Sequence, residues 1–330
     1  MTNIPPDPLP SSIPPETGSE VLPLNLNSQP TRPPILYGRD GLRAGWSVLL
    51  FLCILLPLLV LFGYETRWIA LRLHESMPGS SGGELHPTIA IWSEATSLIA
   101  VLLATAIMAR LERRHTASYG LTGTARARQF FVGLVSGFGF LSLLIAILAG
   151  THHIALTRPQ VSMGKALGYG VAWGICFLLV ALTEELMLRG YLLFTLARGI
   201  RFWPAAVFLG ALFGLLHKSN SGESPFGLVA AAMVALLFSL SLWRLGHLWW
   251  AIGFHAAWDW GESFFYGTAD SGLVSTGRLM HAHPSGSLLG SGGSTGPEGS
   301  VWVVPVLILA ALFVWFTQAK SKSLWAQEGS

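Results

Sequence analysis

Residues 164–198 read GKALGYGVAWGICFLLVALTEELMLRGYLLFTLAR, an apolar run interrupted by two adjacent carboxylates and an arginine. A membrane helix needs about 20 predominantly apolar residues to cross about 30 Å of hydrocarbon, and this run supplies them. An ionisable side chain at the centre of such a helix costs at least about 2.5–3.5 kcal/mol on insertion scales. The run therefore predicts a membrane helix whose charged residues have a function or a partner.

The composition of the whole chain places this helix in a larger membrane protein. Of its 330 residues, 52% are hydrophobic and 11% are charged, and the mean hydropathy is +0.54. Soluble proteins carry about 25% charged residues, so this chain has too few to cover a water-facing surface. The net charge of +3 is a small imbalance and does not predict a nucleic-acid partner. We expect an all-α, polytopic membrane protein.

Hydropathy predicts about eight transmembrane helices. The candidate spans are residues 46–64, 88–110, 129–150, 164–188, 203–217, 225–243, 246–264 and 301–318. With the N-terminus inside, the inner segments hold 14 Lys and Arg residues and the outer segments hold 6. The positive-inside rule then predicts a multi-pass protein of the plasma membrane with both termini in the cytoplasm.

Two segments have a composition unlike that of the spans. Ten of the 19 prolines fall within the first 34 residues, which predicts a disordered cytoplasmic tail over residues 1–40. Gly and Ser dominate residues 267–300, so we expect an irregular, exposed loop on the outer side. Within it, His281 and His283 have no third ligand nearby, and an incidental pair is the favoured interpretation.

Charged residues in the fourth span form a pattern. Glu185 and Arg189 are four residues apart and share one helix face, which suits a carboxylate–guanidinium pair. Glu184 points about 100° away and is free of that arginine. Taken alone, such a pair is more often a structural contact between helix turns than part of a catalytic site.

The fifth and seventh spans each add a histidine at a helical spacing. Phe213 and His217 are four residues apart, as are His255 and Asp259. A single membrane histidine more often bonds a neighbouring carbonyl than takes part in catalysis. However, Glu184 and His217 each lie 14 residues, about 21 Å, from the inner end of their span, and His255 lies nine residues, about 14 Å. Three spans therefore bring these side chains to comparable depths, provided that the long fourth helix tilts or protrudes.

These residues resemble the three motifs of the CAAX-protease and bacteriocin-processing family of membrane proteases, also called the Abi or type II CAAX prenyl endopeptidase family. Its motifs are Glu-Glu-x-x-x-Arg, Phe-x-x-x-His and His-x-x-x-Asn/Asp. Here they read Glu184-Glu185-Leu-Met-Leu-Arg189, Phe213-Gly-Leu-Leu-His217 and His255-Ala-Ala-Trp-Asp259, in order. Asp259 replaces the Asn of the eukaryotic enzymes and is an accepted variant. The resemblance covers residues 164–265 well.

The resemblance implies an intramembrane endopeptidase that cuts a membrane-associated protein or peptide. Glu184 and neutral His217 would activate a water molecule, and His255, oriented by Asp259, would stabilise the oxyanion. Glu185, Arg189 and Phe213 would support them. The predicted organisation is a tail (1–40), N-terminal helices (41–160), a catalytic core (161–266), the Gly/Ser-rich loop (267–300) and a last helix with its tail (301–330).

Several alternatives stay open at this stage. No cofactor is assigned, but two histidines and one glutamate also match a catalytic zinc shell, formed here by Glu184, His217 and His255. The fold could also serve as a non-catalytic membrane scaffold or immunity-type protein, or as a proton-coupled transporter. We further expect Glu94 in the second span not to be catalytic. We also expect a cytoplasmic entrance to the site, at which Arg198, Arg201 and Arg244 hold the substrate.

Overall fold

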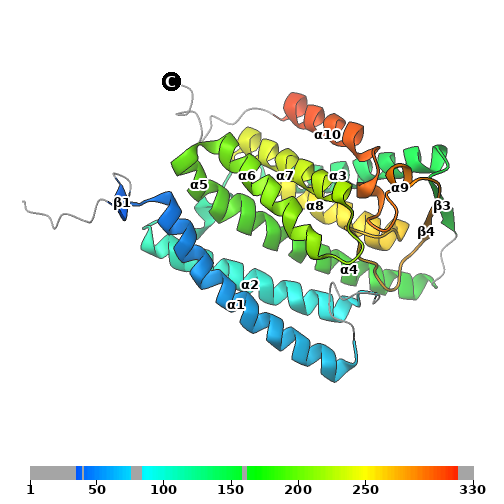
Figure 1. The fold of residues 1–330 in the computed structure, drawn as a ribbon, viewed down its shortest axis with the longest axis horizontal. Helices are drawn as coiled ribbons and strands as arrows, with labels where there is room; N and C mark the ends of the chain where they lie inside the picture. Colours follow the sequence, from blue (N-terminus) through cyan, green and yellow to red (C-terminus); the bar gives the residue numbers. More distant parts are fainter. Residues whose placement is uncertain (1–34, 39–40, 76–83, 158–161, 319–330) are drawn as a thin grey trace, which may run out of the picture.

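The computed structural model describes residues 35–38, 41–75, 84–157 and 162–318 of the chain. Most of the predicted N-terminal tail and the end of the C-terminal tail lie outside the described residues. Just before and after the predicted boundary at residue 40, β1 (Tyr37–Gly38) pairs with β2 (Gly41–Leu42). The all-α prediction is confirmed, since the described part of the chain is a bundle of helices with only two short strand pairs (Figure 1).

The helices follow the predicted spans closely. They are α1 (Ala44–Leu73), α2 (Pro87–Leu111), α3 (Arg126–Gly150), α4 (Met163–Glu184), α5 (Leu193–Ile200), α6 (Phe202–Leu216), α7 (Pro225–Leu245), α8 (Trp249–Trp260), α9 (Leu288–Ser291) and α10 (Val303–Thr317). Within the described ranges, six helical stretches are long and apolar enough to cross a membrane. The other two predicted spans are also helical: α10 has only 15 residues, and α8 carries several polar residues.

The fourth span is a single helical stretch of 38 residues, Met163–Ile200. At 1.5 Å per residue this is about 57 Å, so it exceeds one bilayer crossing as expected. Between α4 and α5 the chain is π-helical over Glu185–Leu192, and Gly190 departs from helical geometry with ψ −105°. Such π segments are frequent at functional sites. This one begins immediately after Glu184.

Helix α8 lies at the centre of the bundle and packs mainly against α3 and α4. Every residue from Trp250 to Asp259 is buried. The α3–α8 contact is close because glycines lie on it: a Cβ at Gly133 would overlap the carbonyl oxygen of Trp250, and one at Gly137 that of Phe254. Gly133 and Gly137 form a small-xxx-small spacing of the kind that lets membrane helices approach closely.

The long loop, residues 267–300, is irregular as predicted, but it is exposed only at residues 283–289 and 294, so the prediction that the whole loop is exposed is wrong. Ser275, Thr295 and Ser300 in this loop are fully buried. The loop folds back over the end of the bundle opposite α5, where its strand β4 (His281–Pro284) pairs with β3 (Ile154–Thr157) (Figure 1). A Gly/Ser-rich composition excludes regular structure but not packing, because small residues with positive φ, such as Gly272 and Gly296, fit close to other backbone.

Candidate functional site

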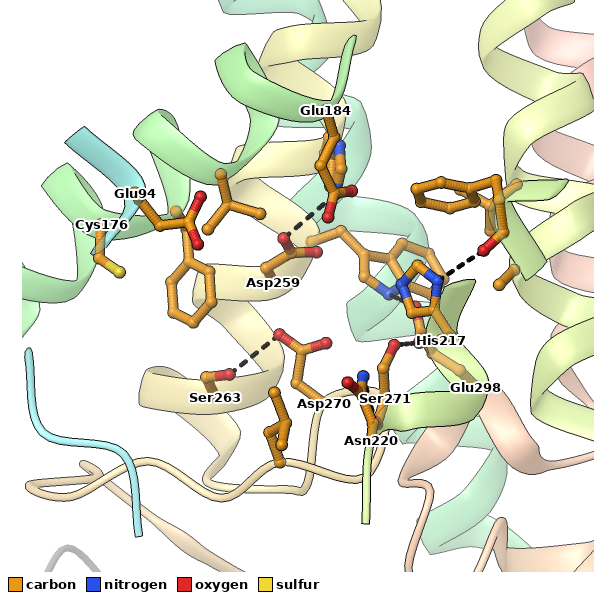
Figure 2. A pocket seen from close by; sticks show the side chains of 18 of the residues that line it. Glu94, Cys176, Glu184, His217, Asn220, Asp259, Ser263, Asp270, Ser271 and Glu298 are labelled. Atoms are coloured by element: carbon orange, nitrogen blue, oxygen red, sulfur yellow. Dashed lines mark hydrogen bonds and ion pairs between the residues drawn. The ribbon is translucent and has the colours of Figure 1, made fainter. Parts of the chain in front are cut away.

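A cavity of about 470 Å³ lies inside the bundle, between α2, α4, α6, α7, α8 and the long loop (Figure 2). Its walls are largely aromatic and aliphatic, with several ionisable side chains among them. The ionisable residues relevant here are Glu94, Glu184, His217, His255, Asp259, Asp270 and Glu298. The structure therefore brings the chemically active residues of all three motifs to one cavity.

The two adjacent glutamates face different surroundings. Glu185 Oε1 accepts a 2.9 Å hydrogen bond from Arg189 Nη1, and both side chains are buried away from the cavity. Glu184 lines the cavity, and its side chain is 28% exposed. The angular separation of neighbouring helix residues thus leaves one carboxylate paired and the other open to a substrate.

His255 on α8 contacts three carboxylates. Its Nδ1 lies 3.3 Å from Glu185 Oε1, and its Nε2 lies 3.3 Å from Asp259 Oδ2 and 3.6 Å from Glu184 Oε2. Since a carboxylate only accepts hydrogen bonds, Nδ1 donates to Glu185, whereas Nε2 lies within ion-pair distance of the other two carboxylates. The imidazole is therefore fixed between the buried ion pair on one side and the cavity carboxylates on the other.

His217 has a defined tautomer. It follows the last residue of α6, and its Nδ1 lies 2.8 Å from the carbonyl oxygen of Phe213. A carbonyl oxygen can only accept, so Nδ1 carries the proton and Nε2 of the neutral ring keeps a lone pair. The ring also packs edge-on against Phe213, with 4.5 Å between centroids. His217 can therefore accept a hydrogen bond from a water molecule in the cavity.

Two aromatic rings connect Arg189 to the histidines. The guanidinium carbon of Arg189 lies 4.6 Å from the ring centroid of Phe213 and 5.6 Å from that of Phe238. Phe238 in turn packs against His255, at 5.4 Å between centroids. These distances suit cation–π contacts, so the two rings hold the buried arginine in place without a second carboxylate.

The cavity residues do not form a zinc shell in this structure. Among the described residues, the acidic and histidine side chains that converge closely enough to hold an ion are Glu262, Asp270 and Glu298. The set of Glu184, His217 and His255 does not converge in this way, and both nitrogens of His255 already face carboxylates. His281 and His283 belong to strand β4.

Glu94, isolated in the sequence, lines the same cavity as Glu184, and the prediction that it is not catalytic remains a prediction. One expectation about the surroundings of the site needs correction. Arg198, Arg201 and Arg244, expected at its entrance, do not line it. Arg198 instead forms a 3.0 Å ion pair with Glu112.

The directions of the helices explain why these arginines do not lie at the cavity. Arg201 directly precedes α6, whereas His217 directly follows it, so the two lie a full helix length apart. The cavity extends from the middle of the bundle toward residues of the long loop, at the opposite end from the arginines.

Three further carboxylates at or beside the cavity were not predicted from the sequence: Glu262, Asp270 and Glu298. Glu262 had a readable signal, because His255, Asp259 and Glu262 follow an i, i+4, i+7 spacing that puts them on one helix face. Asp270 and Glu298 lie in the long loop, where no periodicity relates one residue to another.

The fold and the site together define a polytopic helical membrane protein with a Glu/His/Asp cluster that lines an internal cavity. Residues 168–261 match the family model described as type II CAAX prenyl endopeptidase Rce1-like. This segment contains all three motifs, and the match confirms the family resemblance that they indicate. None of the curated proteins and none of the solved structures that were compared matches the chain.

Proposed function

We propose that this chain is an intramembrane endopeptidase that hydrolyses a peptide bond in a membrane-associated protein or peptide. The observation that carries the proposal is the position of His255 Nε2, 3.6 Å from the cavity-facing Glu184 and 3.3 Å from Asp259, inside the Rce1-like segment. A carboxylate, a neutral histidine and a carboxylate-bound histidine at one cavity are the groups that water-mediated peptide hydrolysis needs.

Glu184 is the general base in this proposal. It removes a proton from a water molecule held between its carboxylate and the lone pair of His217 Nε2. The water oxygen forms a bond to the scissile carbonyl carbon, and the π electron pair of the C=O bond moves onto the carbonyl oxygen. Glu184 then passes the proton to the leaving nitrogen as the carbon–nitrogen bond breaks, which gives an acid and an amine.

His255 stabilises the oxyanion. While Glu184 is ionised, Nε2 of His255 faces its carboxylate and that of Asp259 at ion-pair distances. The contact of Nε2 with Glu184 is 3.6 Å long, whereas that with Asp259 is 3.3 Å. Protonation of Glu184 weakens the longer contact, so Nε2–H becomes available to the developing oxyanion. Asp259 and Glu185 keep the ring in place throughout. Glu185 and Arg189 support the site from outside the cavity, and Phe213, which lines the cavity, packs against Arg189.

The proposed orientation follows from the distribution of basic residues. The excess of Lys and Arg on one side favours cytoplasmic termini in the plasma membrane. The loop end of the cavity then faces away from the cytoplasm, in contrast to the cytoplasmic entrance expected from the sequence.

A cleavage assay on purified protein in lipid nanodiscs tests the function. We expect a fluorogenic peptide anchored in the membrane to be cut by the wild type and not by Glu184→Gln, with both proteins equally folded. A wild type that binds the peptide without cutting it supports the scaffold alternative. Proton flux in sealed vesicles without cleavage supports the transporter. Inhibition by a zinc-selective chelator, reversed by zinc, would replace acid–base activation with metal catalysis.

A further inference from the structure

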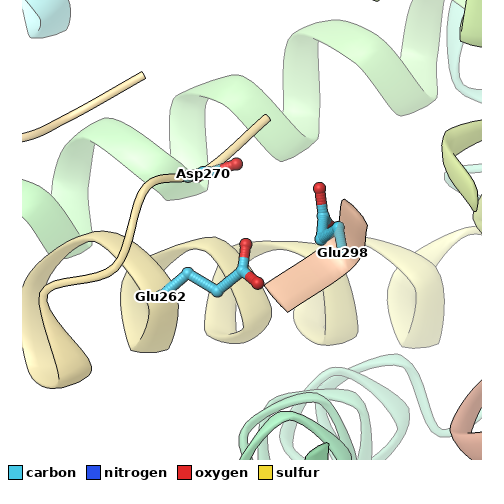
Figure 3. Close-up of side chains that lie close together, drawn as sticks. All are labelled: Glu262, Asp270 and Glu298. Carbon is cyan, nitrogen blue, oxygen red and sulfur yellow. The ribbon is translucent and has the colours of Figure 1, made fainter. Parts of the chain in front are cut away.

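A second cluster of carboxylates lies beside the proposed catalytic site. Glu262 belongs to the π-helical turn Gly261–Tyr266 that continues α8, whereas Asp270 and Glu298 lie near the two ends of the long loop. Figure 3 shows the three side chains converging from these separate segments. One oxygen from each lies within 4.8 Å of the others.

Glu262 is the unusual member of the cluster. Its side chain is completely buried, and no hydrogen-bond donor among the described residues reaches either of its carboxylate oxygens. None of the three carboxylates forms an ion pair with any of the described lysines, arginines or histidines. A buried carboxylate with no donor and no cation is strongly unfavourable unless something else neutralises it.

The other two carboxylates are held in place by their own partners. Trp258 Nε1 and Ser271 Oγ each donate a 2.9 Å hydrogen bond to Glu298, and Ser263 Oγ donates one of 3.1 Å to Asp270. These hydrogen bonds hold the carboxylates close together, where a positive charge between them would stabilise their ionised forms.

We propose that Glu262, Asp270 and Glu298 bind a divalent cation of the calcium type. Oxygen-only ligands are those that hard cations prefer, and Ca²⁺ binds them at 2.3–2.6 Å. Two oxygens bound to one such ion are at most about 5 Å apart. The three carboxylate oxygens lie within 4.8 Å of one another, so they can bind the same ion. Trp258 and the serine hydroxyls orient the ligands from the second coordination shell.

The position of this cation explains two features of the fold. It connects both ends of the long loop to the central helix α8, so that a Gly/Ser-rich segment is held against the bundle. Asp270 and Glu298 also line the catalytic cavity, so the ion fixes part of its wall. The cation is structural in this proposal, and the proposed hydrolysis does not pass through it.

Thermal unfolding of the purified full chain in detergent tests the proposal. After treatment with EGTA, addition of CaCl₂ to the wild type should raise the unfolding midpoint saturably, by roughly 5–10 °C. Glu262→Gln should lose this shift. Glu84→Gln should keep it, because Glu84 contacts the same loop through Arg278 but lies outside the cluster.

Terbium luminescence provides a readout that does not depend on stability. Tb³⁺ binds at calcium sites, and Trp258 lies close enough to sensitise its emission. We expect emission that Ca²⁺ displaces and that falls in both Trp258→Phe and Glu262→Gln. No saturable midpoint shift in the wild type, or an equal shift and equal emission in Glu262→Gln, overturns the proposal. If Glu262→Gln does not fold, Asp270→Asn takes its place in both measurements.

Discussion

Glu185 Oε1 lies 3.3 Å from His255 Nδ1, and the same oxygen accepts the hydrogen bond from Arg189. Glu185 therefore does more than neutralise an arginine within its own helix. It holds the ring of His255 from behind, so that Nε2 faces Glu184 and Asp259 at the cavity. The adjacent glutamates act on one histidine from opposite sides, which gives the Glu-Glu-x-x-x-Arg spacing a physical reason.

Breaking the Glu185–Arg189 pair should reduce the amount of folded protein. Removing one partner leaves the other as an unpaired buried charge, which costs roughly 3–5 kcal/mol. We expect Glu185→Ala and Arg189→Ala each to give a lower yield of monodisperse protein and a lower unfolding midpoint. The double variant Glu185→Leu/Arg189→Met should recover much of the stability but not the activity, since His255 loses its support. Single variants as stable as the wild type would contradict this role.

Glu94 should be dispensable for cleavage although it lines the cavity. Among the described residues it forms no ion pair and contributes to none of the three motifs, whereas Glu184 contacts His255 directly. We expect Glu94→Gln to keep its cleavage rate within about tenfold of the wild type. Glu184→Gln should lose at least about a thousandfold, as expected for a general base. Equal losses in single-turnover assays would place the second span in the catalytic machinery.

Most of the fold could be predicted from the sequence because membrane insertion imposes a strong pattern. Every predicted span corresponds to a helix, and residues 168–261, which match the family model, contain the three predicted motifs. The pairing of Glu185 with Arg189 also follows from helical spacing alone. Helix geometry fixes which side chains share a face, and hydropathy locates each helix, although α1 and the fourth helical stretch extend beyond their predicted ends at residues 64 and 188.

The relations between segments distant in sequence could not be predicted in this way. Nothing in the spacing of Glu94 places it at the cavity, because that depends on how α2 packs against α4. The burial of the long loop depends on the positive φ values of its glycines and on contacts such as that of Leu85 with Ser275. The three arginines were predicted at the entrance of the cavity from their depth along single helices. Such a count does not show at which end of the bundle the cavity lies.

The α3–α8 contact should be sensitive to a single methyl group. A Cβ at Gly137 would overlap the backbone of Phe254, whereas at Gly139 no atom lies within 4 Å. We expect Gly137→Ala to lower stability by about 1–3 kcal/mol through overpacking. Gly139→Ala should be neutral or slightly stabilising, because alanine has the higher helix propensity. Similar unfolding midpoints for the two variants, measured in the same detergent, would argue against close backbone contact there.

Acid should weaken the contact between α2 and α5. Burial alone would raise the pKa of Glu112, but hydrogen bonds, including those from Tyr119 and Arg198, and the charge of Arg198 lower it below 4.5. Because the folded-state pKa is lowered, the stabilisation is present above pH 4.5 and is lost as the pH falls through the lowered value. Glu112→Gln should lose about 1–3 kcal/mol at pH 7 and show a flatter midpoint-versus-pH curve below pH 5. The exposed pair variant Glu84→Gln should follow the wild type.

The last prediction concerns the side of the membrane on which the cavity opens. The basic residues favour cytoplasmic termini, and the structure puts the long loop at the end of the bundle opposite α5 (Figure 1). The loop should then face the outside. Thr124 and Ser285 are exposed positions at the two ends, whereas Ser291 is only 4% exposed and unsuitable as a probe. In a background with Cys53 and Cys176 replaced, an impermeant thiol reagent on intact cells should label Ser285→Cys and not Thr124→Cys. After lysis both should react. Labelling of Thr124→Cys alone would invert the topology and return the cavity to the cytoplasmic side, where substrates would have to be cytoplasmic.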